Sequence, residues 1–309
     1  MHKHTCILFF ILILGSFGCS KDDDLPVVGK DVVVLYDNDV HCAVDGYARF
    51  AALRDSLVMQ NDVCLVSCGD FLSGGDLGDS SEGENIVRIM NMVGYDYVAL
   101  GNHEFDFSVE RLDEVVAELK AEVLCCNFCR ADDKNPVYSS FSIRRLGNIN
   151  VAFIGVVTPD ALTYSEDVIP YFLDENGNYK YTFCRDEIFS VVQKQVDSAI
   201  WMGADIVVLL SHLGDESYVD VSSTLLISNT VGIDVVLDAH QHNVIPGRYV
   251  PNRMGKLVLL SSTGSNFKYA GELRIKSNGY ISSKLIEIDS ITTSNVNVEN
   301  LIAEIRRGN

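Results

Sequence analysis

Five short apolar runs, each leading to a polar side chain that can bind a metal ion, are the feature that most constrains the fold of this chain. The runs are VVVLYDNDVH, VCLVSCGD, YVALGNHE, IVVLLSH and VVLDAHQH, and they lead to His41, Asp70, His103, His212 and the pair His240 and His242. Near-continuous stretches of Val and Leu are typical of strands in a sheet that is covered on both faces. We therefore expect a set of strands whose carboxyl ends meet at one site.

Helix-forming segments separate these runs. They span residues 46–60, 84–93, 108–120 and 186–202. In the third segment, Ser108 can cap the amino terminus, while Val109, Leu112 and Leu119 fall on one apolar face. This alternation of strands and helices predicts an α/β sandwich and argues against separate all-α and all-β halves. Most of the turn-forming residues fall in residues 133–150 and 160–182, which we expect to be loop excursions from one domain.

The charge of the chain excludes one class of partner. The sequence has 24 Lys and Arg against 43 Asp and Glu, which gives a formal net charge of −19. Proteins that bind nucleic acid do so through clustered cations, so nucleic acid is not expected as a partner. A protein this acidic that acts on phosphates needs a local source of positive charge.

The polar side chains at the ends of the runs form a candidate metal site. The set comprises Asp39, His41, Asp70, Asn102, His103, His212, His240 and His242. Mixed imidazole and carboxylate ligands suit Zn, Mn, Fe or Co, whereas Mg and Ca prefer a shell of oxygen atoms. A tetrahedral zinc ion takes about four ligands, so a set of this size predicts two divalent ions that share a bridging ligand.

The cysteines leave several alternatives open. Cys64, Cys68 and Cys184 lie in or beside apolar runs and are expected to be buried thiols that behave as small hydrophobes. Cys126 and Cys129 have the spacing of a redox pair, although no evident active-site helix follows them. A disulfide among the cysteines remains open, and so does a contact between Cys42 and a metal ion.

The ordered motifs resemble the signature of the calcineurin-like metallophosphoesterases. They are D-x-H ending at His41, Gly69-Asp70, G-N-H-E starting at Gly101, the lone His212, and H-x-H starting at His240. The stretches NDVH, GNHEFD, LLSHLG and SSTGSNFKYAGEL resemble the 5'-nucleotidase and UDP-sugar hydrolase branch. The resemblance spans residues 31 to 289 and implies a four-layer α-β-β-α sandwich with two mixed sheets. Two positions depart from the family pattern, since Ala239 and Cys42 stand where glycines are usual.

Roles for the site residues follow from this resemblance. It implies that Asp39, His41 and His242 hold one metal ion, that Asn102, His212 and His240 hold the other, and that Asp70 bridges them. His103 and Asp106 match the catalytic pair of the family. The implied reaction is in-line attack on a nucleotide phosphate by a hydroxide that the two metals share. Alternatives are a 2',3'-cyclic-nucleotide phosphodiesterase, a UDP-sugar hydrolase, a non-catalytic metal-binding subunit and a lipid-anchored binding protein.

The amino-terminal residues have the composition of an export signal. Lys3 is the only charged residue before Cys19, and the apolar core CILFFILILGSF is shorter than the roughly 20 residues that a membrane-spanning helix needs. Gly18-Cys19 followed by an acidic run resembles a bacterial lipoprotein box, although Ser16 stands at its usual aliphatic position. We expect Cys19 to be lipidated and to anchor an exported lipoprotein at the outer membrane, cell surface or periplasm of a Gram-negative bacterium. An ordinary cleaved signal with a polar linker is the alternative.

The expected organisation follows from these assignments. Residues 1–18 form the signal peptide, 19–30 a lipidated polar tether, 31–290 the catalytic domain and 291–309 a tail with one short amphipathic helix. In the resembled branch, a further carboxyl-terminal domain normally supplies the pocket for the nucleobase. We therefore expect either loose substrate selection or a separate polypeptide that provides this surface. The last helix is expected to be a simple surface helix, with a docking role as the alternative.

Overall fold

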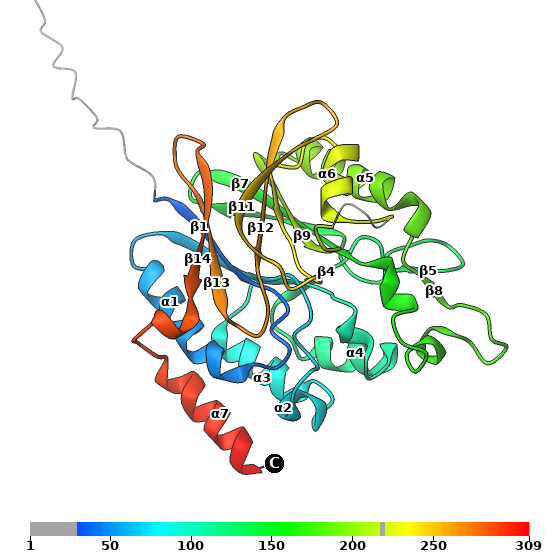
Figure 1. Cartoon of the computed structure of the whole chain (residues 1–309), viewed down its shortest axis with the longest axis horizontal. Coiled ribbons are helices and arrows are strands. Elements are labelled where there is room, and N and C mark those ends of the chain that lie inside the picture. Colours follow the sequence, from blue (N-terminus) through cyan, green and yellow to red (C-terminus); the bar gives the residue numbers. More distant parts are fainter. Residues whose placement is uncertain (1–29, 217–219, 309) are drawn as a thin grey trace, which may run out of the picture.

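Two sheets packed face to face, with helices on their outer faces, form the four layers of the molecule (Figure 1). The computed structural model describes residues 30–216 and 220–308. The strand order is β14-β13-β1-β2-β3-β4 in the first six-stranded sheet and β11-β12-β10-β9-β7-β6 in the second. The predicted α-β-β-α sandwich is confirmed.

Both sheets are mixed, as expected. The first contains β1 (Val32–Asp37), β2 (Asp62–Ser67), β3 (Tyr97–Ala99), β4 (Glu122–Leu124), β13 (Tyr269–Ile275) and β14 (Ile281–Glu287). The second contains β6 (Phe141–Leu146), β7 (Ile149–Val157), β9 (Ile206–His212), β10 (Val235–Leu237), β11 (Val244–Pro251) and β12 (Leu257–Thr263). β1 to β4 are parallel to one another, as are β7, β9, β10 and β12, whereas β13, β14, β6 and β11 pair in antiparallel fashion. A separate ribbon pairs β5 (Cys129–Arg130) with β8 (Tyr181–Thr182).

The helices cover the two outer faces of the sandwich. α1 (Tyr47–Leu57), α3 (Glu84–Val93) and α4 (Val109–Ala117) pack on the first sheet, and α5 (Ile188–Trp201) and α6 (Ser223–Asn229) pack on the second. The four predicted helices are confirmed, and the hydroxyl of Ser108 caps α4 by accepting the N–H of Arg111 at 3.0 Å. The short helices are α2 (Asp76–Asp79), η1 (Val44–Gly46), η2 (His103–Phe105), η3 (Pro159–Leu162), η4 (Ile169–Phe172), η5 (Arg185–Glu187) and η6 (Ile288–Ser290).

The core between the sheets explains the apolar runs in the sequence. Val34 and Val66 of the first sheet belong to one fully buried cluster with Phe153 and Val208 of the second. Because each sheet is covered by helices on its other face, successive residues of its central strands are buried on alternate sides. Each such side chain contributes about 1.5–3 kcal/mol by leaving water, which favours this layered arrangement.

One predicted loop excursion is wrong in part. Within residues 133–150, Phe141–Leu146 and the strand that starts at Ile149 form the antiparallel pair β6 and β7, joined by a turn with Gly147 at φ 55°. β6 is an edge strand with half-buried side chains, so it lacks the apolar run that marks the central strands. Residues 160–182 contain only η3, η4 and β8 and form an excursion, as expected.

The last helix, α7 (Val296–Gly308), packs against α1 and α3 (Figure 1). Val298, Ile302 and Ile305 form its buried face, so the apolar stripe is used within the chain itself. No helix within residues 30–216 and 220–308 is both long enough and apolar enough to span a bilayer. The predicted signal peptide and Cys19 lie outside the described residues.

Candidate metal centre

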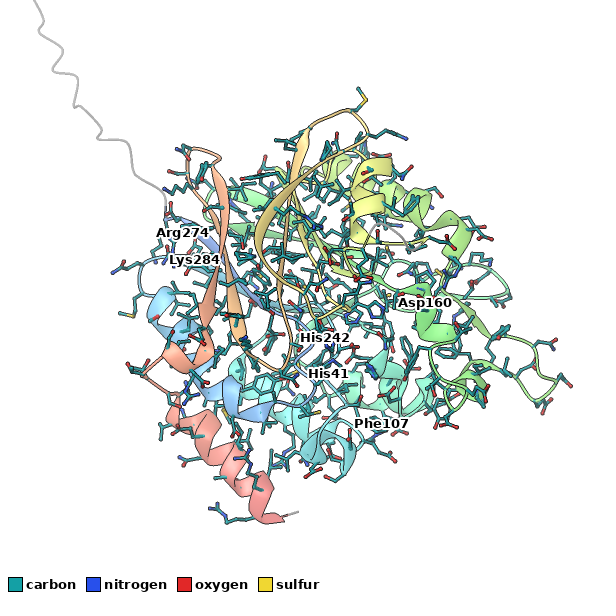
Figure 2. The ribbon with its side chains drawn as sticks, viewed as in Figure 1. His41, Phe107, Asp160, His242, Arg274 and Lys284 are labelled. Carbon is teal, nitrogen blue, oxygen red and sulfur yellow. The ribbon has the colours of Figure 1, made fainter. Side chains whose placement is uncertain are left out.

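The loops at the carboxyl ends of five parallel strands bring the predicted ligands together. Three of these strands, β1, β2 and β3, belong to the first sheet, and β9 and β10 belong to the second. They supply Asp39 and His41 after β1, Asp70 after β2, Asn102 and His103 after β3, His212 at the end of β9, and His240 and His242 after β10. His41 and His242, which are 201 residues apart in the sequence, lie next to each other in space (Figure 2).

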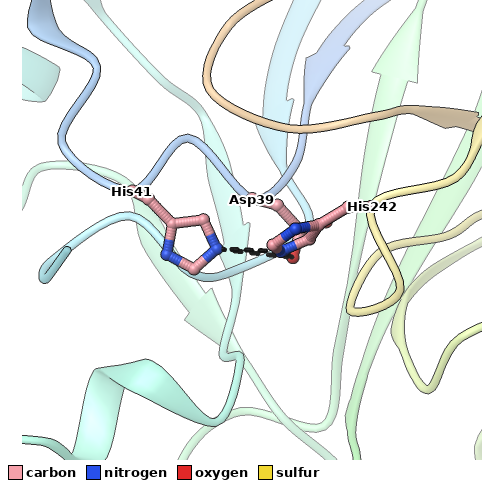
Figure 3. Close-up of side chains that lie close together, drawn as sticks. All are labelled: Asp39, His41 and His242. Carbon is pink, nitrogen blue, oxygen red and sulfur yellow. Dashed lines mark hydrogen bonds and ion pairs between the residues drawn. The ribbon is translucent and has the colours of Figure 1, made fainter.

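Asp39, His41 and His242 form one group of potential ligands. The Nε2 atoms of His41 and His242 are 3.1 Å apart, and they lie 4.0 Å and 3.5 Å from Oδ1 of Asp39 (Figure 3). All three ligand atoms fall within 4.8 Å of one another, which allows a single ion to contact them. The side chain of His242 is 46% exposed, so the group is open to solvent on this side.

A second group surrounds His212 and Asp70. Nε2 of His212 lies 3.1 Å from Oδ2 of Asp70 and 3.8 Å from Oδ1 of Asp39. Nδ1 of His240 lies 2.9 Å from the amide oxygen of Asn102. Because the same Oδ2 atom of Asp70 is also 3.7 Å from Nε2 of His41, this carboxylate faces both groups. The arrangement fits the bridging role expected for Asp70.

The environment of His212 indicates whether these residues suit a metal ion. Its side chain is completely buried, and its Nδ1 atom lies 2.8 Å from the carbonyl oxygen of Cys68, which fixes the ring. Its Nε2 atom has no hydrogen-bond partner among the described residues, although it faces two carboxylates. A buried polar atom without a partner is costly, whereas a ligating imidazole is typically anchored through its other nitrogen in this way. The donor set therefore fits divalent ions.

The ligand loops contain an unusual amount of left-handed backbone. The φ angles are 49° at Asp39, 44° at His41, 59° at Asp70, 83° at His240 and 56° at His242. Each such conformation of a non-glycine residue costs about 1–3 kcal/mol and persists only when the surroundings enforce it. Strain of this kind clusters at functional sites, where the required direction of a side chain imposes an unfavourable backbone conformation.

The electrostatics of the cluster couple its acids to its bases. Burial opposes the ionisation of Asp70, but the neighbouring imidazoles, led by His212, hold the pKa of this carboxyl below its usual range. Burial also disfavours the charged form of His212, but the Asp70 and Asp39 carboxylates raise its pKa to about 10. At His240, burial and the neighbouring His212 outweigh the effect of the Asp70 carboxylate and lower the pKa to about 4. The buried carboxylates of the centre therefore attract positive charge, either a proton or a metal ion.

His103 and Asp106 form a separate pair beside the ligands. Nδ1 of His103 lies 3.0 Å from Oδ2 of Asp106, and this hydrogen bond raises the pKa of His103 to about 9. The His103 and His41 ring centroids are 5.2 Å apart, and His41, Asp70 and His103 also meet the spacing of a metal-binding group. The structure thus brings together all nine predicted site residues of the described chain.

Sequence reasoning missed two residues that hold Asp106. The hydroxyl of Ser73 donates to Oδ2 of Asp106, and the hydroxyl of Tyr164 donates to Oδ1. The Tyr164 ring also meets the His103 ring edge-on, with centroids 5.2 Å apart. Tyr164 lies in the 160–182 excursion, where nothing in the local sequence marks it, so only the folded chain reveals its position.

Glu104, the last residue of the G-N-H-E motif, organises the loops around the centre. Its buried carboxylate accepts backbone N–H groups from Gly101 at 2.6 Å, Asp70 at 2.8 Å, Phe71 at 2.8 Å and Leu72 at 3.1 Å. It therefore ties the Asp70 loop to the Asn102 loop. The glycine at 101 is required because a Cβ there would lie 2.1 Å from Oδ1 of Asp70.

The two departures from the family pattern lie beside the centre without entering it. The Cys42 thiol donates towards the carbonyl oxygens of Phe71 and Leu72, at 3.6 and 3.3 Å. It is not part of any ligand group within the described residues. Ala239 is buried in the core between the sheets.

A histidine and carboxylate cluster at the strand ends of an α-β-β-α sandwich defines a metal-binding α/β protein. The family model of calcineurin-like phosphoesterases matches residues 34–244. The chain therefore belongs to the calcineurin-like phosphoesterase family, as the sequence motifs predicted.

Curated relatives agree with this assignment. The chain is 24% identical over 256 residues to a 2',3'-cyclic-nucleotide 2'-phosphodiesterase/3'-nucleotidase of Haemophilus influenzae, covering 74% of this chain and 37% of that protein. It is 26% identical over 296 residues to the 5'-nucleotidase of Bos taurus, covering 86% of this chain and 49% of that protein. The chain thus spans about half or less of the length of these relatives.

Solved structures share the fold. The calcineurin-like phosphoesterase YfkN of Bacillus subtilis superposes with a TM-score of 0.74 at 22% identity, covering 91% of this chain and 98% of that one. A 5'-nucleotidase precursor of Thermus thermophilus gives a TM-score of 0.75 at 19% identity, covering 90% and 59%. At these identities the likeness establishes the fold alone.

Proposed function

We propose that this protein removes phosphate from nucleotides with the help of two divalent metal ions. The observation that carries the proposal is the convergence of seven ligand-type side chains from five strand ends, with Asp70 among them and its Oδ2 atom facing both groups. Asp39, His41 and His242 would hold one ion; Asn102, His212 and His240 would hold the other. When bound, such ions supply positive charge for the phosphate oxygens and lower the pKa of water towards neutrality.

The charge of the protein makes this centre important for substrate binding. With a formal net charge of −19, the chain as a whole repels phosphate. Two divalent cations would outweigh the two carboxylates of Asp39 and Asp70 and leave a local positive charge. The exposed edge of His242 gives a phosphate ester access to this point.

His103 is the proposed proton donor. Its Nδ1 atom is engaged by Asp106, so Nε2 is the nitrogen left to face a substrate. With a pKa raised to about 9, the ring is protonated at neutral pH and can give a proton to the leaving oxygen or stabilise charge on the phosphoryl group. Asp106 keeps the ring oriented and is itself held by Ser73 and Tyr164.

The names of the relatives guide the choice of substrate. Several curated relatives are 5'-nucleotidases, which supports a nucleoside monophosphate as substrate. The Haemophilus relative supports 2',3'-cyclic-nucleotide hydrolysis as the second candidate. A decisive test measures phosphate release from nucleoside mono-, di- and triphosphates, 2',3'-cyclic nucleotides and UDP-sugars. Mn, Co, Zn or Mg would be added to metal-depleted protein.

Each result of this panel has a clear meaning. Release from 5'-monophosphates supports the main proposal, and release from cyclic nucleotides supports the second candidate. Equal rates with every base indicate loose recognition of the nucleobase. No release with any metal would overturn the enzymatic proposal and favour a non-catalytic metal-binding protein.

We also propose that Cys19 is lipidated and anchors the protein to a membrane. The proposal is supported by the apolar leader and by the Gly18-Cys19 pair with its acidic run. Mass spectrometry of the amino-terminal peptide from the native host tests it. A peptide that starts at Cys19 with a mass increase of attached acyl chains is expected, whereas an unmodified peptide starting beyond Cys19 would refute the anchor.

A further inference from the structure

Two segments on the rim of the molecule, residues 126–129 and 182–184, are locked side by side. Cys129 lies opposite Thr182 in the β5–β8 ribbon. The buried amide of Asn127 donates to the carbonyl oxygen of Phe183 at 3.1 Å, and the Phe128 and Phe183 rings stack with centroids 5.0 Å apart. These contacts fix the backbone on both sides of Cys129 and immediately before Cys184.

The thiols of Cys129 and Cys184 meet in this corner. The Cys129 and Cys184 side chains interact with each other, and both line a cleft of about 280 Å³ that Lys134 and Lys194 flank. Both are buried, with 2% of Cys129 and 6% of Cys184 exposed. Cys126 also borders the cleft, but the Cys129 thiol donates to the backbone carbonyl oxygen of Cys126, at 3.8 Å. The thiol that Cys129 meets is therefore that of Cys184, which is distant in sequence, and not that of Cys126, the other cysteine of the C-x-x-C spacing.

Cys184 also differs chemically from the other cysteines of the described chain. Burial raises the pKa of Cys42 and Cys125 to about 12 and holds those of Cys64, Cys68 and Cys126 well above the usual value. In contrast, the hydrogen bond from Cys129 lowers the pKa of Cys184 to about 7, and nearby Lys134 adds to this effect. A thiol in this environment forms the nucleophilic thiolate near neutral pH.

We propose that Cys129 and Cys184 form a disulfide bond when the protein meets a low-molecular-weight disulfide. The Cys184 thiolate attacks one sulfur of the oxidant and releases the first thiol. Cys129 then loses its proton and attacks the Cys184 sulfur of the mixed disulfide, which releases the second thiol. Two protein thiols are oxidised, and one external disulfide is reduced to two thiols.

The bond would close a loop around the excursion that reaches the metal centre. Residues 130–183 lie between the two cysteines, and they carry Tyr164, whose hydroxyl contacts Asp106. A disulfide bond that joins the two ends of this segment restricts its conformations in the unfolded chain and during local unfolding. The proposal goes beyond the phosphohydrolase function and does not depend on it.

Peptide mapping of the full chain tests the proposal directly. The protein is treated with oxidised glutathione, blocked with an alkylating reagent and digested without reductant. The expected product is a single crosslinked peptide pair that joins Cys129 to Cys184, with the melting temperature raised by roughly 5–10 °C over the reduced protein. A reductant should abolish both signals.

Variants separate this pair from the other possible pairings. Cys129→Ser and Cys184→Ser should each lose the crosslinked peptide and the rise in melting temperature, whereas Cys126→Ser, from the same cleft, should keep both. A crosslink between Cys126 and Cys129, or recovery of Cys129 and Cys184 as alkylated peptides after oxidation of the wild-type protein, would overturn the proposal. The peptide map of the wild-type protein is sufficient to test the proposal, so a variant that fails to fold does not affect the conclusion.

Discussion

The Nε2 atom of His212 lies 3.1 Å from Oδ2 of Asp70, and both side chains are almost completely buried. Asp70 follows β2 of the first sheet and His212 ends β9 of the second, so the pair joins the two sheets at their carboxyl edges. A ligating imidazole must be neutral, so a metal ion bound at Nε2 would take the place of a proton on this nitrogen. The pair therefore favours positive charge at this position, from either a proton or a metal ion.

Loss of Asp70 should remove metal and activity together. Asp70→Ala deletes a carboxylate oxygen that faces both groups of ligands, so we expect metal affinity to fall by at least about 100-fold and turnover to disappear. Elemental analysis after equilibration with Mn or Zn, alongside phosphate release, measures both. Asp133→Ala, which removes an exposed carboxylate, is the matched control. The bridging role is wrong if the Asp70 variant retains two ions per chain.

His103→Ala should separate catalysis from metal binding. The imidazole is held by Asp106 and is assigned to proton transfer, so its removal should lower kcat by about 10²–10⁴-fold while the metal content stays near that of the wild type. Steady-state kinetics and elemental analysis on the same preparation provide the measurement. Near-native turnover would exclude the proton-donor role. A lost ion would instead make His103 a ligand, which its closeness to His41 and Asp70 also permits.

The convergence of the candidate ligands could be predicted from the sequence because each of them is tied to a strong local signal. Asp39, His41 and His212 each adjoin a buried strand, and parallel strands end at a common edge, so proximity followed from the fold class alone. Tyr164 had no such signal, because its place beside Asp106 depends on the path of an irregular excursion. The edge strand Phe141–Leu146 was missed for a related reason: its half-exposed side chains do not form an apolar run.

Tyr164→Phe should affect turnover more than substrate binding. The change removes one hydrogen bond to Asp106 while keeping the ring against His103, so we expect kcat to fall by roughly threefold to tenfold, with KM nearly unchanged. Tyr171→Phe, in the neighbouring η4, is the matched control and should leave both parameters unaltered. An equal loss in the two variants would indicate a general disturbance of the excursion and not a role for the Tyr164 hydroxyl.

Glu104→Gln should destabilise the fold although it changes no side chain among the candidate ligands. The carboxylate accepts four backbone N–H groups, and an amide in its place turns an NH₂ group towards some of these donors. Loss of charged, buried hydrogen bonds predicts a fall of about 3 kcal/mol in the free energy of unfolding, measured by urea denaturation of the metal-free protein. Glu114→Gln changes an exposed partner of Arg111 and should cost less than about 1 kcal/mol. Equal midpoints and slopes for the two variants would contradict the organising role of Glu104.

The reactivity of Cys184 should rise with pH and level off earlier than that of an ordinary thiol. Only the thiolate reacts with iodoacetamide, so a pKa lowered to about 7 predicts a rate that climbs about tenfold per pH unit below pH 7 and is nearly constant above pH 8. The alkylation rate of an ordinary free thiol, with a pKa of about 8.5, would keep rising up to about pH 8.5. The measurement is peptide-resolved alkylation of the protein kept reduced by a phosphine.

Two variants of Cys129 identify the cause of this shift. Cys129→Ala removes the hydrogen-bond donor, so the midpoint for Cys184 should move upward by about one pH unit or more. Cys129→Ser keeps an O–H that can still donate, so its midpoint should fall between those of the wild type and the alanine variant. Cys126→Ala, in the same cleft, should leave the midpoint in place. If the wild-type profile rose steadily to pH 9, or if Cys129→Ala left it unchanged, the contact between the two thiols would not be the source of the reactivity.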